Sequence, residues 1–367
     1  MCIMKVGIIT FNRAINYGAV LQSLALKETI KSLGNECEIL NYECKEVEKV
    51  ASPFYIKSFS VKDILIFLLQ IKMRMVKNKK FDNFAKKYLD KDKQLLTNKN
   101  ISSIKDSYDV FVTGSDQVWN YEITGLDENY FLDFVKGDKQ CISYAASFGV
   151  DKIPNMYEDR YRELLKNMDC ISVREEQGKE IVAALTDNSK ECTVCIDPVF
   201  LFDKSQWEKY ISMPKPEEDY ILVYSINKSE CYEVAKKLSQ ETGLNIVGMQ
   251  VPMSMRDRCK KIQTESPEEF LSWIYHAKYI ITDSFHGTAF SIIFNKKFVV
   301  CTGGKTKARA SRQMNLLKLA NLSSQICTLD NYGMVMDDID YFEVNNRIGE
   351  KRQKALEYLK ESLKRKD

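Results

Sequence analysis

The sequence predicts an α/β protein made of two Rossmann-like, doubly wound domains that face a cleft. Short apolar segments alternate with amphipathic helical patterns along almost all of the 367 residues. The apolar segments are continuous rather than alternating, which is typical of parallel strands covered by helices on both faces. A segment with two prolines and several charges, Met213–Asp219, interrupts this pattern, and the pattern then restarts. The interruption predicts two domains rather than one.

The N-terminal half begins with a buried strand and an amphipathic helix, which Gly34 ends. The expected elements are strand Lys5–Phe11, helix Ala19–Leu33, strand Glu36–Tyr42, a long basic helix Val61–Leu89, and strands Val110–Thr113, Cys141–Ala145, Cys170–Val173 and Thr193–Ile196. Helical patterns fill the intervals between the last four strands. This order predicts a parallel sheet within residues 1–212.

The C-terminal half repeats the alternation after the proline-containing segment. The expected elements are strand Tyr220–Ser225, helix Cys231–Thr242, strand Asn245–Gln250, helix Glu268–Lys278, and strands Tyr279–Thr282, Lys297–Cys301 and Gln325–Leu329. The segment Ser266–Glu269 has the signature of a capping box with proline in the first turn. We therefore expect a second domain over residues 213–345 and a charged terminal helix over 346–367.

Composition excludes several classes of protein. The chain has 54 Lys+Arg against 51 Asp+Glu, far from the basic excess of a dedicated nucleic-acid binder. Its eleven cysteines are an odd number, and most lie in apolar runs, which indicates a reducing compartment. The N-terminus resembles no signal peptide, and the longest apolar run, Ile64–Leu69, is too short to span a bilayer. We expect a cytoplasmic protein.

Metal and dinucleotide sites are not expected. The chain has two histidines, His276 and His286, and a single CxxC, Cys192–Cys195, that strand alternation explains. The loop Asn12–Ala19 after the first strand lacks the GxGxxG pattern of dinucleotide-binding folds. We therefore expect no metal and no cofactor.

Polar loops after the predicted strands contain the candidate functional residues, because ligands of parallel sheets bind beyond the carboxyl ends of the strands. Asp116 follows Val110–Thr113 and is either a helix cap or a reactive group. Arg174 follows Cys170–Val173, and its guanidinium either binds an anion bidentately or pairs with Glu175 or Glu176.

The sharpest candidate is His286, which follows a buried strand and opens a helix of small residues. A histidine there can exchange a proton near neutral pH, and a helix N-terminus attracts anions. The alternative is a capping or packing histidine. His276 lies in an amphipathic helix, where a structural role is expected. The basic loop Lys305–Arg312 is either a solvated surface or part of a phosphate site.

Six motifs at these loops occur in one order along the chain. They are Asn16–Gln22, Val112–Asn120, Ser172–Glu175, Ile196–Pro198, Asp283–Thr288, and Ser311-Arg312 followed by Leu316-Leu317. Together they resemble the polysaccharide pyruvyl transferase family. The resemblance implies a GT-B-like fold and a bacterial enzyme that transfers pyruvate from phosphoenolpyruvate onto sugar hydroxyls. The product would be a ketal in a surface polysaccharide, such as a capsule or exopolysaccharide, or in its lipid-linked precursor.

The resemblance also implies roles for the residues of these motifs. His286 and Asp116 are expected to be catalytic, and the donor substrate phosphoenolpyruvate takes the place of a cofactor. The expected donor-binding residues are Arg174, Ser284, Phe285, His286, Gly287, Thr288, Arg309 and Arg312. The expected acceptor-binding residues are Asn16, Tyr17, Asp116, Gln117 and Trp119. Characterised relatives have arginine and leucine where this chain has Ser284 and Phe285, so Arg309 or Arg312 is expected to replace the missing arginine.

Two other functions and one partner stay open at this point. The same fold would suit a glycosyltransferase that uses a nucleotide-sugar, and the loss of the arginine would suit a catalytically inactive protein that binds a sugar or phosphate. The basic, apolar stretch Val61–Lys93 either contacts the inner membrane surface or packs on its own domain. The acceptor sugar, the ketal configuration and the oligomeric state do not follow from the sequence.

Overall fold

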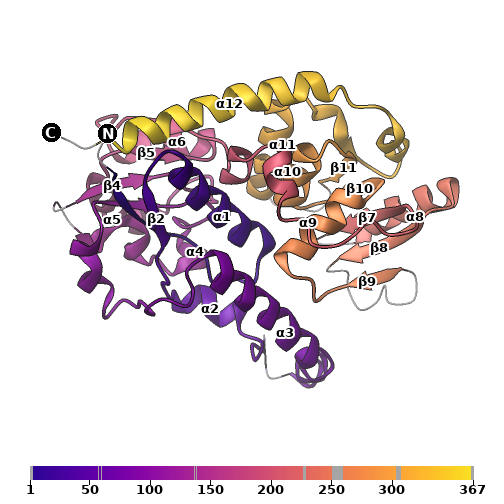
Figure 1. The fold of residues 1–367 in the computed structure, drawn as a ribbon, viewed down its shortest axis with the longest axis horizontal. Helices are drawn as coiled ribbons and strands as arrows, with labels where there is room; N and C mark the ends of the chain where they lie inside the picture. Colours follow the sequence, from indigo (N-terminus) through magenta and orange to yellow (C-terminus); the bar gives the residue numbers. More distant parts are fainter. Residues whose placement is uncertain are drawn as a thin grey trace. The chain divides into compact units, whose positions relative to one another are not determined.

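The computed structural model describes residues 3–56, 58, 60–135, 137, 139–225, 229–249, 259–302 and 307–364, without the side chains of 229 and 307–311. The chain divides into two compact units. The first unit comprises residues 1–201 and 351–367, and the second comprises residues 202–350. Each unit is an α/β structure built on parallel strands (Figure 1).

The first unit contains a parallel sheet in the order β2-β1-β3-β4. Its strands are β1 (Lys5–Ile9), β2 (Glu36–Ile39), β3 (Val110–Thr113) and β4 (Gln140–Ser143). Strands β5 (Ile171–Val173) and β6 (Cys192–Val194) pair with each other in parallel. Single bridges, Ile142 to Cys170 and Ala146 to Val173, join β4 to the β5 edge. The parallel arrangement therefore continues from β4 into β5 and β6.

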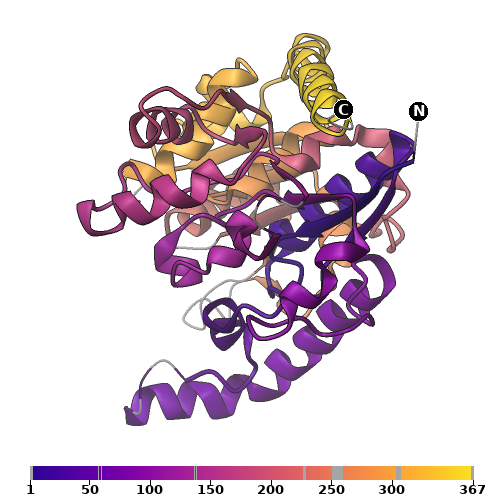
Figure 2. The same ribbon diagram turned by 90° about the vertical axis from the view of Figure 1, so that its left-hand side faces the viewer.

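Helices and aromatic side chains cover this sheet. The helices are α1 (Tyr17–Ser32), α2 (Lys45–Ala51), α3 (Val61–Tyr88), α4 (Tyr121–Thr124), α5 (Asn155–Lys166) and α6 (Glu176–Leu185). Trp119 stacks on Phe131 with 4.9 Å between ring centroids, and Tyr161 meets Phe131 edge to face. These rings belong to a continuous apolar core that includes Phe111 of β3. Figure 2 shows the long helix α3 along the lower edge of this unit.

The second unit contains a six-stranded parallel sheet in the order β12-β11-β10-β7-β8-β9. Its strands are β7 (Tyr220–Tyr224), β8 (Asn245–Met249), β9 (Lys260–Ile262), β10 (Tyr279–Thr282), β11 (Lys297–Cys301) and β12 (Ile326–Cys327). Its helices are α7 (Lys204–Glu208), α8 (Ser229–Thr242), α9 (Pro267–His276), α10 (Phe285–Ile293) and α11 (Lys307–Leu319). The predicted capping box at Ser266 and Glu269 is confirmed.

The second unit begins at Phe202, earlier than the expected domain start at residue 213. The reason is aromatic packing, because Trp207 meets Phe290 of α10 edge to face at 5.0 Å. The expected linker lies inside this unit, and the amide N–H of Met213 donates to Ser272 Oγ. The terminal helix α12 (Tyr341–Ser362) starts in the second unit and ends in the first, where the Tyr358 hydroxyl donates to the Ser143 carbonyl oxygen.

Candidate functional site

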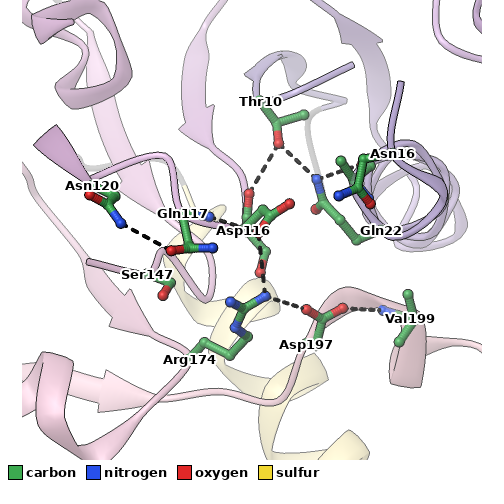
Figure 3. Close-up of polar contacts among 12 residues, drawn as sticks. Thr10, Asn16, Gln22, Asp116, Gln117, Asn120, Ser147, Arg174, Asp197 and Val199 are labelled. Atoms are coloured by element: carbon green, nitrogen blue, oxygen red, sulfur yellow. Dashed lines mark hydrogen bonds and ion pairs between the residues drawn. The ribbon is translucent and has the colours of Figure 1, made fainter. Parts of the chain in front are cut away.

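The candidate residues lie at the carboxyl ends of parallel strands, as the sequence predicts. Asp116 follows β3, Arg174 follows β5 directly, and His286 follows β10 at the start of α10. The structure brings Asp116 and Arg174 together in the first unit (Figure 3). His286 belongs to the second unit. Each unit therefore has its own group of candidate residues, and we call each group a half-site.

The half-site of the first unit is organised around the buried Arg174 side chain. Its Nη1 lies 2.8 Å from Asp197 Oδ2 and 3.9 Å from Asp116 Oδ1, and its Nε lies 3.0 Å from Glu175 Oε1. Burial by itself would lower the pKa of Arg174, but the three carboxylates more than offset burial and raise that pKa above its ordinary value. Arg174 is therefore a permanent cation among three acids.

Each carboxylate around Arg174 also accepts a further hydrogen bond. Glu175 Oε1 accepts from Ser147 Oγ at 2.9 Å, and Asp197 Oδ1 accepts from the amide N–H of Val199 at 3.1 Å. Asp116 Oδ1 accepts from the amide N–H of Gln117 at 2.9 Å. These bonds fix the orientation of all three acids, as Figure 3 shows for Asp197 and Asp116. We call the group Asp116, Arg174, Glu175 and Asp197 the Arg174 cluster.

The backbone of Asp116 has a left-handed conformation, with φ of +75°. Aspartate adopts this region more readily than most residues, yet it is uncommon outside glycine and is found often at functional sites. The turn is held by the amide N–H of Ser147, which donates to the Asp116 carbonyl oxygen at 3.0 Å. The left-handed turn points the carboxylate of Asp116 toward Arg174 (Figure 3).

The charges of the Arg174 cluster indicate what kind of ligand it accepts. Three carboxylates face one guanidinium, so the cluster as a whole is acidic. Carboxylate oxygens accept hydrogen bonds from hydroxyl groups, whereas they repel a phosphate or another carboxylate. The cluster therefore suits a ligand rich in hydroxyls better than an anion.

Two residues that sequence reasoning missed complete the half-site. Asp197 is part of the motif Ile196–Pro198 but is not among the predicted site residues. Its position directly after a predicted strand could have indicated a functional role. The second is Asn12, in the loop after β1, whose buried side-chain amide has no hydrogen-bond partner among the described residues. Nearby, Gln22 Nε2 donates to Thr10 Oγ1 at 2.8 Å, which in turn donates to the Ser115 carbonyl oxygen at 3.2 Å. The end of the sheet is thus lined with amide and hydroxyl groups.

The expected acceptor-binding residues divide into two groups. Tyr17 and Trp119 are fully buried, and the structure gives them packing roles in place of the expected contact. Tyr17 packs on Phe81, and the Trp119 indole N–H donates to the Tyr130 carbonyl oxygen. Asn16 is exposed and caps α1 through the amide N–H of Ala19, and Gln117 is half-buried. Only Asn16, Gln117 and Asp116 of the expected set are placed where a ligand could reach them.

The half-site of the second unit is the N-terminus of α10. Ser284 is its N-cap residue, and its Oγ accepts from the amide N–H of Gly287 at 3.3 Å. Thr282 Oγ1 accepts from the amide N–H of Ser284 at 3.0 Å and donates to the Tyr224 carbonyl oxygen. The Thr288 hydroxyl donates to the Ser284 carbonyl oxygen at 3.0 Å. Buried hydroxyls therefore fix the first turn of the helix.

His286 lies on this fixed turn, 9% exposed, with its ring edge to face against Phe285 at 5.1 Å. A Cβ atom on Gly287 would lie 2.3 Å from Thr282 Oγ1 and 2.9 Å from Tyr224 Cδ1, so the close approach requires glycine. Asp283 is buried before the turn. Burial raises the pKa of Tyr224 well above its ordinary value, and the charge of Asp283 adds to that effect.

Some donor-binding predictions fall on residues that the structure does not fully describe. Residues 303–306, with Lys305, lie outside the described residues, and Arg309 lies in α11 with its side chain outside them. Arg312 is half-buried on α11, which packs against α10. His276 has the expected structural role, since its Nε2 lies 3.0 Å from the Met213 carbonyl oxygen. Among the described residues, no group of three histidines, cysteines or acids is placed to hold a metal ion.

Comparison with known proteins identifies a family. Residues 16–304, most of the chain, match the family model described as polysaccharide pyruvyl transferase. No curated protein matches the sequence significantly.

Some solved structures are similar to this one, but with low sequence identities and low TM-scores. They include the UDP-GlcNAc 2-epimerase of Methanocaldococcus jannaschii, 13% identical, with a TM-score of 0.48 and 91% of both chains covered. The UDP-GlcNAc 2-epimerase of Neisseria meningitidis is 11% identical, with a TM-score of 0.44 over 96% of this chain and 100% of that one. The ADP-heptose heptosyltransferase II of E. coli is 13% identical, with a TM-score of 0.40 over 96% and 99%. At such values the likeness carries no conclusion about function.

Proposed function

The chain belongs to the polysaccharide pyruvyl transferase family, and from this premise we propose that it transfers the pyruvyl group of phosphoenolpyruvate onto two hydroxyls of a sugar. The products are a cyclic ketal and inorganic phosphate. The sugar belongs to a bacterial surface polysaccharide or to its lipid-linked precursor. The observation that carries the proposal is the position of Asp116, Arg174 and His286, each at the carboxyl end of a parallel strand of its unit.

The two half-sites suit the two substrates differently. The acidic Arg174 cluster, with Asn12, Asn16 and Gln117 near the same strand ends, favours the hydroxyl-bearing acceptor. The N-terminus of α10 has the positive end of the helix dipole and favours the anionic donor. We therefore assign the acceptor to the first unit and phosphoenolpyruvate to the second, with Arg312 on the neighbouring helix as a further cation.

Arg174 then has a different role from the expected donor contact. Its Nε and Nη1 already face carboxylates, and a donor trianion would meet those acids as well. We propose that Arg174 positions Asp116 and the other acids instead of binding the donor.

The reaction needs proton transfers at four places, namely the methylene carbon, the two sugar hydroxyls and the leaving phosphate. The methylene carbon of phosphoenolpyruvate gains a proton, which makes the adjacent C2 electrophilic. One sugar oxygen bonds to C2 and gives up its proton, the C2–O bond to phosphate breaks, and the second sugar oxygen bonds to C2 and gives up its proton. The two hydroxyl protons balance the proton gained by the methylene carbon and the one that leaves with phosphate. We assign the base at the attacking hydroxyl to Asp116 and proton transfer at the donor to His286.

The assay for this proposal is phosphate release from phosphoenolpyruvate with a panel of sugar acceptors. General acid–base groups contribute about 10²–10⁴ in rate, so His286→Ala and Asp116→Asn should each lower turnover about a hundredfold or more. The matched control is His276→Ala, which removes the other histidine of the chain and should leave turnover close to wild type. Unchanged turnover in His286→Ala would remove this residue from the mechanism.

A second arm of the assay separates the proposal from its nearest rival. Nucleotide-sugars are offered in place of phosphoenolpyruvate, and free nucleotide is measured. We expect no release. Nucleotide release, with no phosphate from phosphoenolpyruvate on any acceptor, would replace the proposal with a glycosyltransferase.

A further inference from the structure

The first five turns of α3 leave apolar side chains uncovered. In the 28-residue helix, only Phe81, Phe84 and Ala85 near its C-terminal end are buried. Seven large apolar side chains before them are between 37% and 85% exposed: Val61, Ile64, Leu65, Leu68, Leu69, Met75 and Val76. We call these seven residues the apolar face of α3. Single exposed apolar residues are ordinary, but a contiguous group marks an interaction surface.

The spacing of these residues puts them on one side of the helix. From Val61 to Leu69 they recur at intervals of three and four residues, and Met75 and Val76 follow Leu68 and Leu69 by seven residues, so all lie on a single helix face. Lys72 and Lys79 are exposed at the same period, between and after the apolar residues. From Val61 to Val76 the apolar face is about 23 Å long, at 1.5 Å per residue. Figure 2 shows this part of α3 extending beyond the strands of its own unit.

The net charge around the apolar face is positive. Between residues 61 and 80 there are six basic residues, Lys62, Lys72, Arg74, Lys77, Lys79 and Lys80, and one acid, Asp63, a net charge of +5. Arg74 donates to the Tyr55 carbonyl oxygen at 2.7 Å, and Lys77 lies over the ring of Tyr17. Lys62, Lys72 and Lys79 are exposed at the solvent side. The surface thus combines a long apolar strip with a strong positive charge.

We propose that the apolar face of α3 docks on an anionic lipid bilayer, with the helix lying in the plane of the membrane surface. Apolar residues on one side and lysines beside them are typical of helices that bind at the lipid–water interface. A second copy of the chain is a poorer occupant, because it would bring one net charge of +5 against another. Among the described residues, no helix is both long and apolar enough to cross a membrane.

The docking surface and the acceptor half-site belong to the same unit, and one pocket is lined by residues of α3 and by Asn16 of the half-site. A pocket of about 380 Å³ separates the loop after β1 from α2 and α3, and its walls include Asn16, Val50, Pro53, Arg74 and Lys77. Asn16 is one of the residues assigned to the acceptor. A membrane-anchored sugar would therefore be held near these residues. This last step rests on the proposed function, whereas membrane docking does not.

Vesicle flotation tests the docking. The full-length protein is mixed with vesicles of phosphatidylcholine alone or of equal parts phosphatidylcholine and phosphatidylglycerol. We expect flotation with the anionic vesicles, weakened by added salt, and little with phosphatidylcholine. The double variant Leu65→Glu/Leu68→Glu should reduce flotation about tenfold or more, because it removes apolar contact and adds negative charge. The variant Lys72→Glu/Lys79→Glu should reduce it with anionic vesicles only.

The matched control is Phe342→Glu, which changes an 80% exposed apolar residue on α12 and should not affect flotation. Circular dichroism confirms that each variant is folded. Phosphate release with a short water-soluble acceptor should be the same in Leu65→Glu/Leu68→Glu as in the wild type, so failure of docking and failure of the proposed reaction are read separately. The docking is wrong if the wild type does not float, or if Leu65→Glu/Leu68→Glu floats equally. A wild-type dimer that this variant dissociates, without flotation of either, would identify a second copy as the occupant.

Discussion

At the scale of single residues, Arg174 compensates the charge of several buried acids. The Asp197 side chain is completely buried, and those of Glu175 and Asp116 are only slightly exposed. Removal of one partner from a buried ion pair leaves an uncompensated charge, which costs far more than the pair itself contributes. The stability of the first unit and the geometry of Asp116 therefore depend on the same guanidinium.

Arg174→Met should lower the free energy of unfolding by about 3–5 kcal/mol, because it leaves buried carboxylates without their cation. Urea denaturation followed by tryptophan fluorescence measures the change. The double variant Arg174→Met/Asp197→Asn should recover part of the loss, since it also removes one of the uncompensated charges. If the double variant is less stable than Arg174→Met by the full cost of a second independent substitution, the ion pair to Asp197 does not stabilise the unit.

Lys296 shows the opposite case, a largely buried cation with no ion pair among the described residues. It follows α10, and its Nζ donates to the Tyr275 carbonyl oxygen at 2.9 Å. Burial and, to a smaller extent, the charges of Lys204 and Lys215 together lower the pKa of Lys296 to about 8, although the charge of Asp219 acts in the opposite direction. At neutral pH the folded protein therefore carries a partly desolvated ammonium group.

The stability of the wild type relative to Lys296→Met should rise as the pH increases from 8 to 10. In this range the unfolded chain still binds the proton of Lys296, whereas the folded protein has lost it, so a rise in pH favours folding. The gain should be on the order of 1–2 kcal/mol, allowing for the partial exposure of the side chain. Unfolding free energies of both proteins at several pH values measure it. A constant difference between them would show that the pKa of Lys296 is not lowered.

At the scale of elements, the start of α10 depends on one close approach. Gly287 brings the helix against Thr282 and Tyr224, and there is no room for a Cβ atom. Gly349, on α12, has no heavy atom within 4 Å of the position of its Cβ atom. Packing therefore requires glycine at position 287 but not at position 349.

Gly287→Ala should lower the free energy of unfolding by about 1–3 kcal/mol, because the new methyl group displaces Thr282 and the first turn of α10. It should also lower turnover, since His286 is on that turn. Gly349→Ala should raise stability by about 0.5–1 kcal/mol, as alanine has the higher helix propensity. Thermal melts and the phosphate assay measure both variants. Equal effects of the two substitutions would contradict the packing argument.

The regular elements were largely predictable because each has a strong local pattern. The expected strands Val110–Thr113, Tyr279–Thr282 and Lys297–Cys301 are confirmed with the same bounds. The helix α2 and the short strand β9 (Lys260–Ile262) were missed, because neither has a long apolar period. The terminal helix begins at Tyr341 rather than Asn346, within the residues that pack on the second unit.

The candidate site was predictable in position but not in its contacts. The strand-end rule located Asp116, Arg174 and His286, because it depends only on chain order. It could not show that Arg174 faces Asp197, which is 23 residues further along the chain. Nor could it separate Tyr17 and Trp119, whose aromatic rings face the core, from exposed neighbours such as Asn16. Tertiary packing determines these contacts, and local sequence patterns do not predict them.

At the scale of the whole molecule, the chain leaves the first unit at Leu201 and returns to it within α12. The returning segment supplies Ala355 and Leu359, both buried, to the first unit. The Arg352 guanidinium donates to the Phe200 carbonyl oxygen, and Gln140 Nε2 of β4 donates to the Ser362 carbonyl oxygen. The first unit therefore includes the C-terminal part of α12, which is far along the chain from its other elements.

Leu359→Ala should destabilise the first unit by about 2–5 kcal/mol, the usual cost when a large buried side chain is shortened and leaves a cavity. Hydrogen–deuterium exchange measures where the effect lies. Amides of β4 (Gln140–Ser143) should exchange faster, because Tyr358 and Ser362 of α12 bond to this strand, while amides of β7 and β10 should keep their protection. Phe342→Ala on the same helix is the control and should change neither set, since its ring is 80% exposed. Equal loss of protection in β4, β7 and β10 would show that the two units unfold as a single cooperative body.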